Sequence, residues 1–122
     1  MFLKFDKSKI TEKKAVYVFK FYLDWNNNDI VYKIGVTSRE EVGRRLSEVL
    51  LGFYTTFRFT PRCTVLRFSS CNDAYGKEKV LHREFKDSSI RFNGKFGGST
   101  EFFQIEDEDG LLAMYDKEVK GI

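Results

Sequence analysis

The sequence predicts an α+β domain in which an antiparallel β-hairpin and a third strand combine with helices, and three observations favour this. Residues 15–46 have the pattern of two strands, joined by a polar loop and followed by a helix. Residues 62–68 have the pattern of a further strand, and two later segments have helical periodicity. The 122 residues, 42% hydrophobic and 16% aromatic, suffice for one compact domain and not for two.

The predicted hairpin has two possible registers, which differ in the side chains that share a face. Its strands are expected at residues 15–23 and 30–36, on either side of a polar loop. In one register Leu23 opposes Ile30, and Tyr17 and Lys33 then lie on opposite faces. In the other Leu23 opposes Asp29, and the two side chains become near-diagonal neighbours on one face. The sequence leaves both registers open.

A first helix is predicted from about Arg39 to Leu51. Ser38, followed three residues later by Glu41, is a capping-box signature, and Gly52 is a typical helix stop. One apolar stripe at helical spacing is expected to face the sheet. Its members are Val42, Leu46, Val49 and Leu50.

The two adjacent arginines of this helix are expected to differ in position. At about 100° per residue, Arg45 lies at the edge of the apolar stripe and can lean over the sheet. Arg44 points nearly opposite, where a solvated charge is the ordinary outcome.

A second helix, predicted from about Asp73 to Lys86, carries a carboxylate in an unusual place. Ala74, Leu81 and Phe85 define its apolar face. Glu78 lies inside that face, with His82 at its margin. A carboxylate aimed at a core costs several kcal/mol unless it is paired or binds a metal. A metal site at Glu78 and a buried salt bridge, for example to Arg45 or Lys33, both remain open.

The other elements are assigned from composition. An aromatic, threonine-rich segment precedes the third strand, a glycine-rich loop precedes a short strand or edge segment, and an acidic run precedes the last helix. In chain order these are residues 53–59, 62–68, 91–98, 99–105, 106–109 and 109–119.

The charge and cysteine content limit the class of protein. A net charge of +3 permits a nucleic-acid partner without requiring one. Cys63 and Cys71, with no signal-peptide pattern, favour a reduced compartment, and together with His82 they lack the spacing of structural zinc sites. No segment approaches the roughly 20 apolar residues of a membrane span. We expect a cytoplasmic protein (in the host cytoplasm if viral) that does not bind membranes.

Several short motifs occur in a specific order. AVY stands at 15–17, YKIG at 32–35, an arginine before leucine at 45–46 and AYGKEKVLHREF at 74–85, followed by RFNG and EFF. This series, over residues 15–105, resembles the GIY-YIG endonuclease superfamily, and most of all its branch in phages and large DNA viruses with KIG in place of YIG. The resemblance implies a single nuclease domain over residues 1–122, with a small three-stranded antiparallel sheet flanked by helices.

The resemblance also implies roles for individual residues. Tyr17 corresponds to the tyrosine that activates the water nucleophile, and Lys33 replaces the tyrosine of the second motif. Arg45 corresponds to the arginine that handles the scissile phosphate, and Glu78 to the carboxylate that holds Mg²⁺ or Mn²⁺. By this resemblance the protein is a metal-dependent DNA endonuclease that cuts by direct attack of water.

Further candidates complete the expected site. Tyr32, Arg44 and Asn93 are candidate substrate-binding residues, with Asn93 matched to the late asparagine of the superfamily. His82 is either a catalytic group that orients water or a helix histidine with a purely structural partner. The departures from the pattern are Ala15 in place of glycine and a longer hairpin loop.

Two other functions fit the same sequence. The domain could bind DNA with little or no cleavage, which predicts salt-sensitive binding. Alternatively, the aromatic segment 53–59 could contact a protein partner. The oligomeric state and the DNA specificity are not encoded in any pattern that we recognise.

Overall fold

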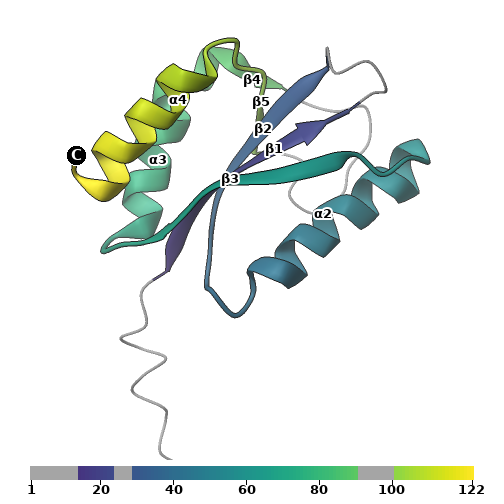
Figure 1. The fold of residues 1–122 in the computed structure, drawn as a ribbon, viewed down its shortest axis with the longest axis horizontal. Coiled ribbons are helices and arrows are strands. Elements are labelled where there is room, and N and C mark those ends of the chain that lie inside the picture. The colour runs from purple at the N-terminus through teal and green to yellow at the C-terminus, as the bar shows by residue number, and fades with distance from the viewer. Residues whose placement is uncertain (1–13, 24–28, 91–100) are drawn as a thin grey trace, which may run out of the picture.

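A five-stranded antiparallel sheet forms the middle of three layers (Figure 1). The computed structural model describes residues 14–23, 29–90 and 101–122. The strand order is β3 (Arg62–Ser70), β1 (Ala15–Tyr22), β2 (Ile30–Thr37), β5 (Phe102–Phe103) and β4 (Ser89–Ile90). Helix α2 (Val42–Phe57) covers one face, and α3 (Ala74–Glu84) and α4 (Glu108–Tyr115) cover the other. A 3₁₀ turn, η1 (Lys86–Ser88), follows α3, and a π turn, η2 (Asp116–Lys120), continues α4.

The two faces of the sheet form two separate hydrophobic clusters. Tyr17, Phe19 and Phe21 of β1 pack with Val49 and Phe53 of α2. The alternate residues of the same strand pack against α3 and α4 on the other side. Both faces of β1 are therefore buried, which explains why its sequence is an almost continuous apolar run instead of an alternating one.

The hairpin adopts the register that brings Tyr17 and Lys33 onto one face. The Leu23 N–H donates to the Asp29 carbonyl oxygen at 2.7 Å. Tyr17 lies opposite Gly35, and Phe19 lies opposite Lys33. Because side chains alternate along a strand, Tyr17 and Lys33 both point toward α2.

The predicted three-stranded sheet is wrong, since the structure adds two short strands. Strand β5 pairs with β2, and β4 pairs with β5. Each has only two residues, too few to produce a detectable alternation. Strand β5 falls within the segment 99–105 that was expected to be a short strand, whereas β4 was not anticipated.

The first helix also differs from its prediction. Helix α2 begins at Val42, after Glu41, and no side chain caps it. Ser38 is buried, and its carbonyl oxygen accepts from the Glu41 N–H in the preceding turn. The helix continues past Gly52 to Phe57 and ends where Arg58 adopts a left-handed backbone conformation. Segment 53–57 is therefore helical, because its aromatic side chains pack on the sheet face and outweigh the weak stop signal of glycine.

The third strand and the later helices lie close to their predicted positions. Asp73 caps α3 by accepting from the Gly76 N–H, and Asp107 caps α4 by accepting from the Gly110 N–H. Helix α4 and η2 together span 108–120, against the predicted 109–119. Among the described residues, no helix is long and apolar enough to cross a membrane.

Candidate functional site

The candidate site lies at the outer edge of β2, next to the two residues at which β2 pairs with β5. Strand β5 pairs with β2 only at Tyr32 and Lys33. At Ile34 the backbone N–H donates to the Glu101 carbonyl oxygen at 3.3 Å. The Ile34 carbonyl oxygen lies 2.8 Å from Nε2 of His82 on α3. The His82 side chain thus hydrogen-bonds to the backbone of β2 and holds α3 against this edge.

Tyr17 approaches this edge across a glycine. Its ring is buried and stacks on Phe19, with 4.1 Å between the ring centroids. A Cβ atom at Gly35 would overlap the Tyr17 hydroxyl. The absence of a side chain at Gly35 therefore leaves room for the Tyr17 ring to extend from β1 over β2, with its hydroxyl at Gly35.

Lys33 is a fully buried cation on the same face. Its Nζ lies 2.7 Å from Oε1 of Glu101 and 5.2 Å from the centroid of the Phe102 ring. Burial lowers the pKa of Lys33, and the attraction of Glu101 opposes that shift. The lysine is held in place by a carboxylate from the residue just before β5.

Arg45 and Glu78 approach from helices on opposite sides of the sheet (Figure 1). Arg45 is partly buried on α2, and the Glu78 side chain on α3 is 13% exposed. Both are near enough to perturb the pKa values of Tyr17 and Lys33. Four elements therefore contribute charged or ionisable groups to one region.

The two carboxylates of this region repel each other. Burial raises the pKa of Glu78, and the charge of Glu101 raises it further. His82 and Lys33 act in the opposite direction. Both the burial of Glu78 and the nearby charge of Glu101 therefore disfavour the charged form of the Glu78 carboxyl.

Burial also raises the pKa of Tyr17 well above its usual value. Glu101 and Glu78 add to this increase, and Arg45 reduces it. In the free protein at neutral pH, the tyrosine therefore keeps its proton.

His82 is held mainly by the backbone. A carbonyl oxygen only accepts, so the contact with Ile34 places a proton on Nε2 of His82. The same nitrogen lies 3.8 Å from the Glu78 carboxylate, beyond hydrogen-bond distance. The ring also packs edge-on against Phe103. These contacts give His82 a structural role at the edge of β2.

The other candidate residues do not join the cluster. Tyr32 points to the opposite face of the sheet, and its hydroxyl donates to Glu108 at 2.8 Å. Arg44 is exposed and forms ion pairs with Glu41 and Glu48. Asn93 lies outside the described residues.

A pocket of about 550 Å³ also lies away from this cluster, on the Tyr32 face. Its lining consists of Ile30, Tyr32, Gln104, Ile105 and Glu106. This pocket and the converging charges are therefore separate features.

Glu101 is the site residue that sequence reasoning missed. Its signal was the EFF motif, in which a carboxylate directly precedes two aromatic residues of a strand. Alternation alone would place Glu101 and Phe102 on opposite faces. The ion pair with Lys33 arises because the regular pairing of β5 begins only at Phe102.

Comparison with known proteins identifies relatives of the chain. The model of the T5orf172 domain family matches residues 14–119. A protein of Escherichia phage T5 named "Putative endonuclease" is 33% identical over 100 residues, which cover 75% of this chain. The chain spans 34% of the length of that relative. No solved structure matches significantly.

Proposed function

We propose that this chain, which belongs to the T5orf172 domain family, is a metal-dependent DNA endonuclease of the GIY-YIG type. What supports the proposal is that Tyr17 and Lys33 share the α2 face of the hairpin at the edge of β2, within electrostatic range of Arg45 and Glu78. The name of the phage T5 relative supports a nuclease, although the matched region covers only 34% of that protein. Target recognition is therefore not assigned to this chain.

The cations of the site suit a phosphodiester. Arg45 presents a planar guanidinium that matches two phosphate oxygens, and no ion pair with another described residue occupies it. Lys33 adds a second positive charge within electrostatic range of Arg45, on a side chain that is completely buried from water. Both charges favour the extra negative charge that develops on the phosphoryl oxygens as water attacks.

Tyr17 has a narrower role in this proposal than that of a strong base. Because its pKa is raised, its hydroxyl oxygen holds its proton in the free protein. In that form it orients the attacking water by hydrogen bonding. It can accept the proton of the water only when added positive charge in the site outweighs the charges of Glu78 and Glu101.

The donor set at Glu78 fits a hard divalent cation. Within the described part of the chain, its carboxylate has no hydrogen-bond partner, and Glu101 supplies a second oxygen donor nearby. The described residues contain no group of three or more potential protein ligands. Mg²⁺ commonly uses one or two carboxylates and completes its shell with water and phosphate. Glu78 would hold Mg²⁺ or Mn²⁺, which supplies charge neutralisation at the phosphate.

Cleavage of supercoiled plasmid tests the proposal. We expect nicking or linearisation with Mg²⁺ or Mn²⁺ and none in EDTA. Glu78→Gln should reduce the rate by at least about 100-fold. Glu84→Gln, an exposed position on the same helix, is the matched control and should stay within about twofold of the parent.

Three outcomes would contradict parts of this function. Cutting by Glu78→Gln at the parent rate would remove the proposed metal ligand. Full activity in EDTA would exclude metal dependence. Salt-sensitive DNA binding without any cleavage would favour the alternative of a DNA-binding module.

A further inference from the structure

Helix α3 carries a basic stripe beside Glu78 that the proposed chemistry does not use. The stripe consists of Tyr75, Lys79 and Arg83 of α3, spaced four residues apart, and of Lys86, the first residue of η1. All four residues are exposed, Tyr75 to 58%. Residues four apart lie along one side of a helix, so Tyr75, Lys79 and Arg83 form one row, and Lys86 follows just beyond the end of α3.

The position of the stripe relative to the site follows from helix geometry. Lys79 follows Glu78 by one residue, which rotates it by about 100°. Leu81 lies about 60° from Glu78 in the other sense and is completely buried. Glu78 therefore lies between the buried face of α3 and the basic stripe, and a ligand on the stripe extends directly over the carboxylate.

The stripe concentrates positive charge in a chain that has little overall. Its three cations equal the net charge of the whole protein, which is +3. Within the described residues, no ion pair engages Lys79, Arg83 or Lys86, whereas Arg44 and Arg67 are paired with carboxylates. Glu84 lies about 140° around the helix from Lys79 and does not face the stripe. Asp87, next to Lys86 in η1, is the exposed carboxylate nearest to that end of the stripe in sequence, and no ion pair joins it to Lys86 in the described residues.

We propose that the α3 stripe binds the sugar-phosphate backbone of duplex DNA and positions a phosphodiester over Glu78. This inference rests on the proposed function and adds the surface that holds the substrate. Lys79 and Arg83 are separated by about 6 Å along the helix axis. That length is close to two nucleotide steps of one DNA strand, at about 3.4 Å each.

Tyr75 is expected to contribute in a different way from the cations. It lies one turn before Lys79, toward the Asp73 end of α3, and its ring is among the most exposed large hydrophobic groups. An exposed ring at the end of a cationic track can pack on sugar or on an unpaired base. Such packing does not release counterions, so it should change affinity without changing its salt dependence.

DNA binding without cleavage provides the test. Anisotropy of a fluorescein-labelled 25-base-pair duplex is measured in EDTA from 50 to 300 mM KCl. Arg83→Gln should lower the slope of log K against log[KCl] by about 0.9, and the triple change Lys79→Gln, Arg83→Gln and Lys86→Gln by about 2.7. The triple variant should also bind at least about tenfold more weakly at 100 mM KCl. Tyr75→Ala should weaken DNA binding by a factor that is the same at every KCl concentration, so that the slope stays that of the parent.

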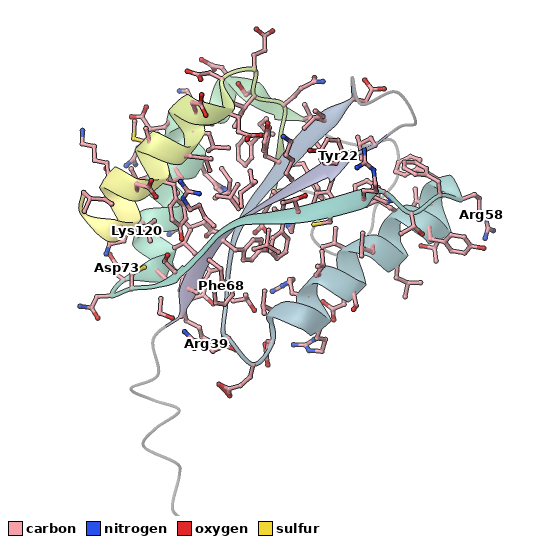
Figure 2. The ribbon with its side chains drawn as sticks, in the orientation of Figure 1. Tyr22, Arg39, Arg58, Phe68, Asp73 and Lys120 are labelled. Atoms are coloured by element: carbon pink, nitrogen blue, oxygen red, sulfur yellow. The ribbon has the colours of Figure 1, made fainter. Side chains whose placement is uncertain are left out.

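Arg58→Gln is the matched control. Arg58 is also exposed, and Figure 2 shows it at the far end of α2, on the other side of the sheet from α3. Its removal should leave the slope unchanged. All the changes are at exposed positions, and thermal unfolding within about 2 °C of the parent establishes that each variant is folded.

Several results would overturn the inference. One is a slope for Arg83→Gln equal to that of the parent, and another is an equal loss in Arg58→Gln, which would indicate a general effect of charge. A third is loss of binding to phosphatidylserine vesicles with DNA binding intact, which would assign the stripe to an anionic membrane.

The proposed function and this inference fail separately. Glu78→Gln should bind the duplex with the parent slope. If the stripe variants lose DNA binding but no variant or parent cleaves, the stripe holds and the endonuclease proposal fails. If the parent cleaves DNA and the stripe variants cleave limiting DNA at the parent rate, the endonuclease proposal holds and the proposal that the stripe binds DNA fails.

Discussion

Two lysine–glutamate pairs on opposite faces of the sheet differ in how well their charges are satisfied. On the α4 side, Lys20 and Glu108 lie 2.6 Å apart, and Tyr32 also donates to Glu108. Hydrogen bonding raises the pKa of Lys20 and lowers that of Glu108, so each charge is favoured. This cluster links β1, β2 and α4.

On the α2 side, Lys33 and Glu101 are separated by a similar distance, 2.7 Å, but the pKa of this lysine is shifted in the opposite direction. Burial lowers the pKa of Lys33, and the Glu78 carboxyl beside the pair has a raised pKa. The charged forms of Lys33 and of the neighbouring Glu78 are therefore both disfavoured. Charges that a fold holds in an unfavourable state are typical of a binding site, whereas mutually favourable charges are typical of structure.

Replacing each lysine by methionine should give the largest difference between the clusters. Lys33→Met removes a fixed cation from the proposed site and should reduce DNA cleavage by about 100-fold or more. A buried charge replaced by an apolar side chain of similar length need not destabilise the fold. Lys20→Met should stay within about twofold of the parent. Plasmid cleavage and thermal unfolding measure both, and equal losses of activity would remove the distinction.

Replacing each glutamate by glutamine should give a smaller difference, in stability. Glu101→Gln leaves the buried Lys33 without its carboxylate. Because the Glu101 side chain is itself 36% exposed, we expect a loss of about 2 kcal/mol in the free energy of unfolding, below the usual cost of breaking a buried pair. Glu108→Gln should cost about 1 kcal/mol or less.

Urea unfolding of the two variants measures this difference, and a third variant isolates its cause. In the double variant Lys33→Met with Glu101→Gln, the buried positive charge is gone as well, so most of the stability should return. If the double variant is as unstable as Glu101→Gln alone, packing at residue 101 explains the loss and the ion pair does not.

The sequence predicted the elements that depend on local pattern. Strand β3 and helix α3 lie near their expected bounds because apolar periodicity and the Asp73 cap are local signals. The unusual position of Glu78 was also visible, since a carboxylate on an apolar helix face is a local anomaly.

The features that depend on pairing between distant segments were not predictable. The hairpin register required the contact between Leu23 and Asp29, and either register satisfies the hydrophobic pattern. Glu101 reaches Lys33 from 68 positions along the chain, and no spacing rule connects them. Ser38 had the sequence of a helix cap but is buried in the preceding turn, so tertiary packing outweighed the capping signal.

The smallest expected difference is the sign of the pH dependence for two glutamates. The hydrogen bond to Lys20 holds the folded-state pKa of Glu108 below its ordinary value of 4.5. Its charge therefore stabilises the fold above pH 4.5, and this stability is lost as pH falls through the folded-state pKa. The folded-state pKa of Glu78 is above 4.5. Its contribution to stability is therefore complete below pH 4.5 and is lost as pH rises through the raised pKa.

Matched glutamine variants, unfolded thermally in EDTA, make these opposite signs measurable. At pH 7, Glu108→Gln should lower the melting temperature and Glu78→Gln should raise it, each by a few degrees or less. At pH 4 the difference for Glu78→Gln should shrink toward zero, because the raised pKa leaves the Glu78 carboxyl largely protonated there. The difference for Glu108→Gln should shrink only at lower pH, as the pH falls through the lowered pKa of Glu108. A lower melting temperature for Glu78→Gln at pH 7 would mean that Glu78 is a satisfied structural charge like Glu108. Glu78, the residue that the proposed metal site requires, would then not differ from Glu108 in the way that the comparison of the two clusters states.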